Sequence, residues 1–286
     1  MLMFLYSIIF LLFVASEPTN AATAYISNEK DNTISVIDLK KMEVTNTIEV
    51  GQRPRGIILS QDEKYLYICA SDDNRIDALN LETLKVEFNL LSGPDPELLV
   101  LHQDGRSLFI ANEDDNLVTV TDTKERMIVE EIVVGVEPEG LGLSPDGKVL
   151  VNTSETTNMA HFINTETLEV FENVLVDARP RVAVFNKKGN EVWVSAEVGG
   201  TVSIIDPKTF NMDIQKLEFE LEKNPNKFKF IMPVNIFGAP VDYDHLYKLK
   251  QKYNLVIIED AAQSFGSKFK GKKSGVLGDV GCTSFY

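Results

Sequence analysis

A repeat with a period of 42 residues constrains this 286-residue chain more than any other feature. An apolar string ends in Asp or Asn once per period, and its last residues are Asp38, Asn80, Asp122, Asn164 and Asp206. A proline keeps the same period, at Pro54, Pro96, Pro138 and Pro180. A unit that recurs in this way buries its apolar faces against neighbouring copies, so the chain is expected to fold as a row of similar units.

Each period predicts four short strands. In the third repeat these are "EGLGLS", "VLVNTS", "AHFIN" and "LEVFENV", separated by the turn residues Pro, Asp, Asn and Gly. A four-stranded unit of this length is typical of a β-propeller blade. Counted from the prolines, about three blades are complete, the first lacks its innermost strand and the last lacks its outermost. We therefore predict a mainly β fold, with a truncated β-propeller over residues 23–210 whose strand edges are open.

Several strings resemble a known propeller family. "LFIANEDDNLVTVTD" and "VGVEPEGLGLSPDGK" are similar to the YVTN class of seven-bladed propellers. "SNEKDNTISVID", "GQRPRGIILS", "SGPDPELLVLHQDGR" and "NTSETTNMAHFI" resemble an exported branch associated with PQQ-dependent alcohol catabolism. The resemblance covers roughly residues 23–209. It implies a non-catalytic binding or interaction protein, with a periplasmic quinoprotein dehydrogenase system or a small polar ligand as partner, and it does not imply that this chain binds the quinone.

Charged residues beside the four prolines are the candidate binding residues of the propeller. The prolines enter each innermost strand, so their neighbours are expected to line one rim of the central channel. These neighbours are Arg53, Arg55, Asp95, Glu97, Glu137, Glu139, Arg179 and Arg181. An arc with basic ends and an acidic middle could orient a polar ligand or a charged partner. The alternative is that the rim is polar because its loops are solvated.

The first residues predict export. "MLMFLYSIIFLLFVAS" is an apolar run of signal-peptide length, followed by small residues and "NAA" at 20–22. Residues 1–22 are therefore predicted to be a signal peptide, cleaved after Ala15 or Ala22, and the protein to be periplasmic or secreted. No basic residue precedes the run, although a signal peptide begins with positive charge, so an uncleaved membrane segment is the alternative. The run is, however, shorter than the roughly 20 residues of a bilayer span.

Charge and metal-ligand spacing exclude other classes of function. The chain has 43 acidic and 28 basic residues, which argues against nucleic-acid binding. The excess is uneven: residues 213–286 hold 11 Lys against 9 Asp and Glu, whereas the preceding residues hold 17 basic and 34 acidic.

Cys69 and Cys282 lie on opposite sides of this change in charge and are both expected to be buried thiols. His161 is expected to be a packed strand residue, and no metal-ligand spacing is present.

After "IIDPKTF" the repeat fails and the period of the pattern changes. "MDIQKLEFELEK" predicts a helix capped by Asp213, and "FKFIMPVNI" predicts a buried strand. "VDYDHLYKLKQKYN" predicts a second helix, opened by Asp242 or Asp244, and "LVIIED" a second buried strand. This order is a β-α-β unit, so residues 211–286 are predicted to form part of a parallel sheet covered by helices.

This segment resembles the DegT/DnrJ/StrS sugar aminotransferases, which use pyridoxal phosphate (PLP). The likeness rests on "VIIEDAAQSFG" and "GVLGDVGCTSF". It implies that Asp260 pairs with the pyridinium nitrogen of PLP, that Gln263 lies against the coenzyme ring, and that Ser284 holds the phosphate. The expected fold is an α/β fragment of a PLP-dependent aminotransferase.

The family continues beyond "TSF" to the lysine that forms the Schiff base, and this sequence stops at Tyr286. Lys272 and Lys273 are expected in a solvent-exposed loop and not to replace that lysine. The segment is therefore expected to be inactive and to hold no cofactor as it stands. The leading hypothesis is an exported propeller-type interaction protein joined near residues 207–213 to this fragment. The alternative is a PLP-dependent nucleotide-sugar aminotransferase.

Overall fold

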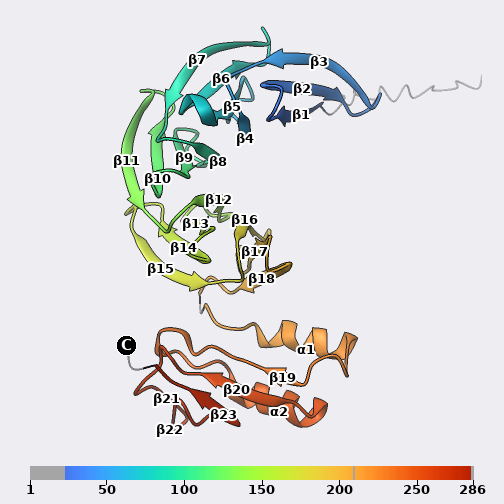
Figure 1. The fold of residues 1–286 in the computed structure, drawn as a ribbon, viewed down its shortest axis with the longest axis vertical. Helices are drawn as coiled ribbons and strands as arrows, with labels where there is room; N and C mark the ends of the chain where they lie inside the picture. The colour runs from blue at the N-terminus through green and yellow to red at the C-terminus, as the bar shows by residue number, and fades with distance from the viewer. Residues whose placement is uncertain (1–22, 209, 285–286) are drawn as a thin grey trace, which may run out of the picture.

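The protein is described by a computed structural model that covers residues 23–208 and 210–284 (Figure 1). The predicted signal peptide, residues 1–22, lies outside these described residues. Antiparallel sheets follow one another along the first part of the chain, and a smaller α/β unit follows them. The mainly β fold predicted from the sequence is confirmed.

Five antiparallel sheets form the first part. The first sheet holds β1 (Thr23–Asn28), β2 (Thr33–Asp38) and β3 (Glu43–Glu49). The second holds β4 (Pro54–Leu59), β5 (Tyr65–Ala70), β6 (Arg75–Asn80) and β7 (Lys85–Leu91), with the short 3-10 helix η1 (Ser71–Asp73). The third holds β8 (Pro96–Leu101), β9 (Ser107–Asn112), β10 (Leu117–Asp122) and β11 (Met127–Val133). The fourth holds β12 (Pro138–Leu143), β13 (Val149–Ser154), β14 (Met159–Asn164) and β15 (Val170–Leu175). The fifth holds β16 (Pro180–Phe185), β17 (Val192–Ala196) and β18 (Thr201–Ile205).

These sheets are arranged as blades in an open arc (Figure 1). In each complete blade the four strands pair in sequence order, and the proline-led strand is innermost. The innermost strands of successive blades contact one another, β4 with β8, β8 with β12, and β12 with β16. Among the described residues three blades have four strands, while the first and the last have three, as the repeat predicted.

The Asp or Asn that marks each period forms the turn before the outermost strand. Asp122 Oδ1 accepts hydrogen bonds from the backbone N–H of Lys124 and of Glu125, both at 2.9 Å. Arg126 then adopts a left-handed φ of 59°. The side chains of Asp38, Asn80 and Asn164 make the same turn in their blades. The marks of the repeat are therefore turn residues, because a short side-chain acceptor can hold two consecutive N–H groups.

A second repeated side chain ties each blade to the next. Asn116 has a left-handed φ of 62°, which asparagine tolerates better than most residues, and its Oδ1 accepts from the N–H of Glu137 at 3.2 Å. Asn32, Asn74 and Asn158 make the equivalent bonds to Arg53, Asp95 and Arg179. In the last blade this position is Gly200, which keeps the left-handed φ, at 61°, without the side chain.

The apolar core lies between blades. Phe109 and Val118 of the third blade pack against Leu150 and Ile163 of the fourth, and all four are at most 1% exposed. Equivalent clusters lie between the other successive blades. Each such side chain contributes about 1.5–3 kcal/mol through its burial, so a blade depends on its neighbours for stability.

Two glycines bring the fourth and fifth blades close together. A Cβ at Gly140 would lie 2.2 Å from the carbonyl oxygen of Arg181, and one at Gly142 would lie 2.4 Å from that of Ala183. Both distances are well below van der Waals contact, so β12 and β16 approach with no room for a side chain at these two positions.

The C-terminal unit contains α1 (Ile214–Lys223), β19 (Phe230–Ile231), the 3-10 helix η2 (Ile236–Gly238), α2 (Tyr243–Tyr253) and β20 (Val256–Asp260). The hairpin of β21 (Lys268–Phe269) and β22 (Lys272–Lys273) and the strand β23 (Val280–Cys282) follow. Strands β19, β20 and β23 pair in parallel, which confirms the predicted β-α-β unit.

Two details of this unit differ from the prediction. The buried strand expected over 228–236 is only two residues long, and Phe230 is 62% exposed. Pro233 has no N–H to donate, and the chain beyond it makes only an isolated bridge between Val234 and Asp260. The expectation of a buried Cys282 is wrong, since it is exposed on the edge strand β23, whereas Cys69 is buried as expected.

Helix caps follow the sequence signals. Asp213 caps α1 by accepting from the N–H of Gln215 at 3.0 Å and of Lys216 at 3.1 Å. Asp242, one of the two predicted candidates, caps α2 by accepting from the N–H of His245 at 3.2 Å. Neither helix, nor any other in the described part of the chain, is long and apolar enough to cross a membrane.

Candidate functional site

The predicted rim residues lie beside the prolines that begin β4, β8, β12 and β16, and they form an ion-pair network between blades. Arg53 contacts Asp95 and, at 2.6 Å, Glu97. Arg55 contacts Glu97 and, at 3.1 Å, Glu139. Each arginine therefore reaches carboxylates on one or two following blades.

The same pattern continues at the other end of the rim. Arg181 contacts Glu139 at 2.8 Å and also Glu155. Arg179 contacts Glu155 at 2.6 Å. Glu137 accepts a hydrogen bond from the hydroxyl of Thr156. The structure thus brings most of the predicted rim residues together, with one another as partners.

Two of the predicted rim carboxylates are buried. Glu97 is 0% and Glu139 is 4% exposed, so a solvated rim does not describe these positions. Burial and the nearby charge of Glu139 raise the pKa of Glu97 to about 8, although Arg55 opposes the shift. Burial likewise raises the pKa of Glu139 to about 7, against the opposing effect of Arg181 and Arg55.

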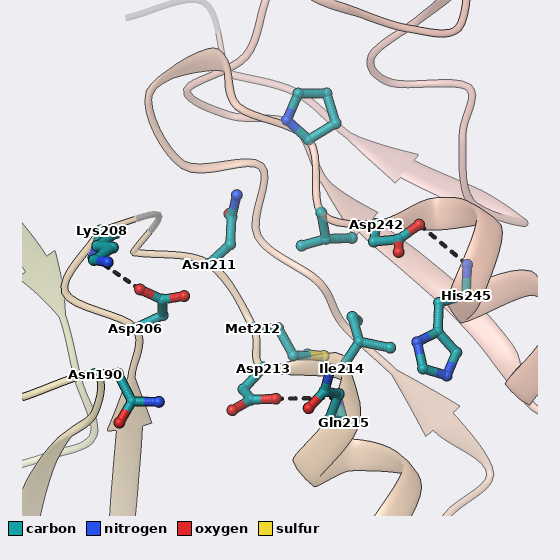
Figure 2. A pocket seen from close by; sticks show the side chains of 12 residues that line it. Asn190, Asp206, Lys208, Asn211, Met212, Asp213, Ile214, Gln215, Asp242 and His245 are labelled. Atoms are coloured by element: carbon teal, nitrogen blue, oxygen red, sulfur yellow. Dashed lines mark hydrogen bonds between the residues drawn. The ribbon is translucent and has the colours of Figure 1, made fainter. Parts of the chain in front are cut away.

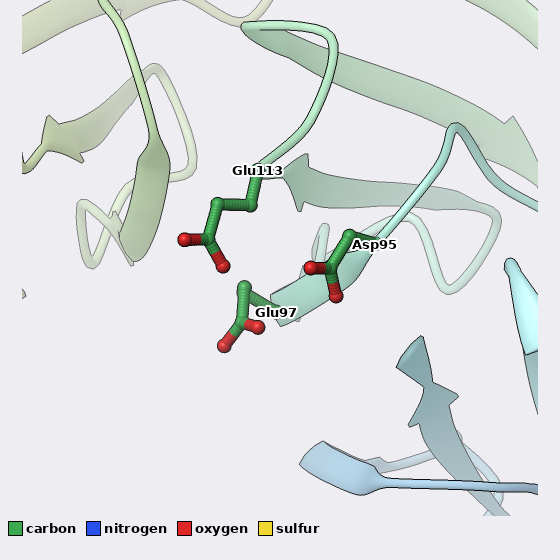
Figure 3. A group of neighbouring side chains, drawn as sticks. All are labelled: Asp95, Glu97 and Glu113. Atoms are coloured by element: carbon green, nitrogen blue, oxygen red, sulfur yellow. The ribbon is translucent and has the colours of Figure 1, made fainter. Parts of the chain in front are cut away.

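Asp95, Glu97 and Glu113 form an acidic group, with carboxylate oxygens within 4.8 Å of one another (Figure 3). Arg53 already contacts Asp95 and Glu97, and its guanidinium supplies positive charge at this place. The group therefore gives no argument for a metal ion.

Sequence reasoning missed the glutamates that complete the rim. Glu155 holds both Arg179 and Arg181, and Glu29 lies 3.3 Å from Arg55. A signal was present, because Glu113, Glu155 and Glu197 are themselves 42 residues apart. The prolines lie in the turn that leads into each innermost strand. The glutamates that pair with the rim arginines lie in a different turn, which follows the next strand of the blade at the same rim.

A cavity of about 480 Å3 lies where the arc meets the C-terminal unit (Figure 2). Asp206, Asp213, Asp242 and His245 are among its lining residues. The carboxylates of Asp213 and Asp242 already accept the N–H groups at the starts of the two helices. Asp213 and Asp242 thus act as helix caps, Asp206 accepts from the N–H of Lys208 at 2.8 Å, and His245 contacts Glu218 at 2.9 Å.

The residues implied by the aminotransferase resemblance lie at one edge of the parallel sheet. Asp260 is the last residue of β20 and is half-buried, with its Oδ1 accepting from the N–H of Ala262 at 3.0 Å. Its register partner on β23 is Cys282, two residues before Ser284. Gln263 lies in the loop that follows β20. The carboxyl edge of a parallel sheet is where α/β proteins bind ligands.

Beside Asp260, Glu259 organises this edge of the sheet. Its side chain is 0% exposed, and one oxygen accepts from the Nδ2 of Asn235 at 2.7 Å and the hydroxyl of Ser274 at 2.9 Å. The backbone N–H groups of Gly275, Leu277 and Gly278 donate to the same carboxylate at 2.8, 2.6 and 3.2 Å. Sequence reasoning did not single out Glu259, although it stands next to Asp260 in the same motif.

One face of the parallel sheet carries exposed apolar side chains. Phe230, Val256 and Val280 are 62, 37 and 53% exposed. The register places Phe230 beside Val256 and Ile258 beside Val280, on the face that also carries Asp260. Ile257 on the opposite face is fully buried with Leu246 and Leu249 of α2. The Asp260 face has no such helical cover in the described residues.

The C-terminal part of the chain is similar to known proteins. Residues 195–286 match the DegT/DnrJ/EryC1/StrS aminotransferase family. A UDP-2-acetamido-2-deoxy-3-oxo-D-glucuronate aminotransferase of Pseudomonas aeruginosa is 45% identical over 82 residues, which are 29% of this chain and 22% of that protein. A GDP-perosamine synthase of Caulobacter vibrioides is 43% identical over 81 residues, 28% of this chain and 21% of that protein. The chain thus spans about a fifth of the length of the curated relatives it matches.

A solved structure is similar in fold over about two thirds of the chain. Hydrazine synthase of Kuenenia stuttgartiensis superposes with a TM-score of 0.60 at 23% identity, covering 65% of this chain and 60% of that chain. At this identity the likeness concerns the fold alone.

Proposed function

We propose that the C-terminal unit is part of the coenzyme site of a PLP-dependent aminotransferase that acts on nucleotide-linked sugars. One observation carries the proposal: Asp260, Gln263 and Ser284 follow adjacent parallel strands at one sheet edge, within a segment up to 45% identical to sugar aminotransferases. A family resemblance found in the residues and a common location in the fold therefore agree.

The chemistry of these side chains fits the coenzyme. A carboxylate such as Asp260 can accept a hydrogen bond from the protonated nitrogen of a pyridinium ring, and the hydroxyl of Ser284 can donate to a phosphate. The amide of Gln263 can contact the ring. When bound, PLP supplies the electron sink on which transamination depends. The chain's own contribution is to bind and orient the coenzyme, and to keep its ring nitrogen protonated through the negative charge of Asp260.

Glu259 supports coenzyme binding indirectly, by holding the neighbouring loop in place. Its carboxylate ties β20 to the 274–278 loop, which leads into β23 and on to Ser284. The positions of Asp260 and Ser284 therefore depend on one buried group. The relatives act on UDP-linked sugars or are named for GDP-linked ones, so a nucleotide-linked sugar is the class of substrate we propose.

Equilibrium binding of pyridoxamine phosphate tests the proposal. This form of the coenzyme has no aldehyde, so it does not react with surface lysines. We expect the full chain to bind it and D260N to bind about tenfold more weakly, because one charge-assisted hydrogen bond is lost. D244N, which removes an exposed carboxylate paired with Lys270, is the matched control. Equal binding by the parent chain and D260N contradicts the proposal.

For the arc we propose a binding role without catalysis. The proposal rests on the repeat and on the propeller-like strings of the sequence, because the charged rim side chains already pair with one another across blades. The links to export and to quinoprotein alcohol oxidation are proposals that rest on the sequence strings alone. Cell fractionation with N-terminal sequencing tests export. A periplasmic chain beginning after Ala15 or Ala22 is expected, and an intact cytoplasmic chain contradicts it.

A further inference from the structure

The last sheet of the arc exposes an apolar face. Val182, Val184, Trp193 and Val202 are 41, 55, 46 and 54% exposed. They line a hollow of about 290 Å3. Lys216 of α1 lies 5.1 Å from the centre of the Trp193 ring, and the ring stays nearly half exposed beside it. An apolar surface of this kind on a soluble domain marks a contact surface.

The repeat identifies what this face is built to contact. One, two and three periods before Trp193 stand Val151, Phe109 and Tyr67, which are 0, 1 and 5% exposed. The positions before Val202 are Ala160, Val118 and Ile76, all 0% exposed. In each of these blades the side chains are covered by the next blade of the arc. We call this side of a blade its trailing face. The exposed face of the last sheet is a trailing face without a following blade.

The first sheet exposes the opposite kind of face. Ile26 is 47% exposed, whereas Ile68, Ile110 and Val194, at one, two and four periods later, are 0% exposed. Those three side chains pack against the preceding blade. We call this side the leading face. Among the described residues, the arc therefore ends in a leading face at β1–β3 and a trailing face at β16–β18 that no further blade covers; the two sheets lie at opposite ends of the arc (Figure 1).

The outer edge of the last sheet is open as well. β18 pairs with β17, and beyond it the described residues add only a bridge between Ile205 and Met212. In the third blade the corresponding edge of β10 is covered by β11. An unpaired edge of this kind offers N–H and C=O groups to an added strand.

We propose that this end of the arc is a docking site for a separate polypeptide that supplies further β-sheet of the same repeat. Its first strand would pair with β18, and its next sheet would cover Trp193 with a leading face of Leu and Ile. The third and fourth blades provide the template. Leu98, Val100 and Phe109 give the third blade a trailing face as bulky as the last one, and Leu150 and Ile163 of the fourth blade cover that face.

One segment of this chain can serve as the binding probe, and Trp193 can serve as the fluorescent reporter. Residues 123–176 comprise β11 and the whole fourth blade, and in register they would follow Asp206 as they follow Asp122. Trp193 is the only tryptophan of the chain and lies outside this segment. We expect a polypeptide of residues 123–176, added to the full chain, to shift Trp193 emission to shorter wavelength and to lower its quenching by acrylamide several-fold.

Matched variants locate the contact. V184E should weaken binding of the probe by about 100-fold or more, because the complex would bury an unpaired carboxylate. V129E is the control, since Val129 on β11 is 53% exposed, close to the 55% of Val184, and lies away from this face. Binding that is equally sensitive to both changes, or to neither, overturns the proposal. So does self-association of the full chain alone that buries Trp193, because the occupant would then be a second copy.

A covalent fusion tests the same contact in case the separate probe does not fold alone. Residues 123–206, carrying W193F in the inserted copy, can be placed directly after Asp206 and extend the repeat in register. If circular dichroism reports added strand and Trp193 becomes protected, the face accepts a blade. If Trp193 stays as quenchable as in the parent chain, the proposal fails. It also fails if the insert protects Trp193 but the separate probe, at up to about 100 µM, does not.

Discussion

The arc and the C-terminal unit bury carboxylates in different ways. Glu97 and Glu139 in the rim are compensated by guanidinium groups that reach across from other blades. Glu259 is compensated by neutral donors within its own unit, three of them backbone N–H groups. The first arrangement neutralises charge with charge, whereas the second solvates a charge with fixed dipoles. The rim should therefore respond to protonation and to loss of an arginine, and the Glu259 site to the shape of one loop.

The largest effect is expected from E259Q. A glutamine amide presents an N–H2 group to N–H donors that now bond to the carboxylate, so it should cost about 3 kcal/mol of unfolding free energy in the C-terminal unit. Hydrogen exchange of the amides at 274–278 measures the change. E220Q, on the exposed face of α1, should leave this exchange within error of the parent chain. Unchanged protection in E259Q would remove the contrast between the two regions.

R55M should have the next largest effect. It leaves Glu97 and Glu139 with fewer cationic partners, and removal of one partner of a buried ion pair costs about 2–3 kcal/mol in a partly exposed setting such as this. Urea unfolding above pH 8, where both carboxylates are ionised, followed by strand circular dichroism, measures the loss. K64M is the control, because Lys64 and its partner Asp62 are both exposed, and a loss under about 1 kcal/mol is expected for an exposed pair. Equal losses would show that rim burial adds nothing.

The pH dependence sharpens the comparison further. The folded-state pKa values of Glu97 and Glu139, about 8 and about 7, lie above the ordinary 4.5. The folded arc therefore binds these protons more tightly than the unfolded chain. Its stability from this source is complete below about pH 4.5 and is lost as the pH rises through 7 to 8.

Melting temperatures at pH 5, 6.5 and 8 measure this trend. The double variant E97Q/E139Q mimics the protonated forms and should flatten it. An arc that becomes more stable between pH 5 and 8, with a slope that the double variant keeps, would contradict the assignment to these two groups.

The smallest effect is expected from N158A. Asn158 has a left-handed φ of 55°, and its Oδ1 accepts from the N–H of Arg179 at 2.9 Å. Alanine should cost about 1–2 kcal/mol, through the lost acceptor and the less tolerated backbone conformation. N46A, at an exposed strand position, is the control for the same change of side chain. Chemical unfolding distinguishes the two if the loss in N158A exceeds that in N46A.

The blades were predictable because the residues that mark the repeat form the turns between strands. The Asx acceptors at 38, 80, 122 and 164 fix a local turn whatever lies around them, so their spacing translates directly into strands. The caps Asp213 and Asp242 were predictable for the same reason. Local hydrogen bonds leave local signals in a sequence.

Contacts between blades were less accessible. The pairing of Arg181 with Glu155 depends on which turns of neighbouring blades face each other, and no local pattern states that. The burial of Glu97 was missed because a charged residue beside a turn proline is usually solvated. Cys282 was misjudged because an apolar string indicates a strand without indicating whether both faces of its sheet are covered.

Gly140 and Gly142 have a consequence for assembly of the arc. Blades of one repeat offer similar faces to one another while the chain collapses, so wrong neighbours compete with right ones. Strand β16 reaches its place against β12 only because these two positions lack side chains. Against β8 it would meet Leu98 and Val100 instead. The glycine pair thus distinguishes the fourth blade from the third as the packing partner of the fifth blade.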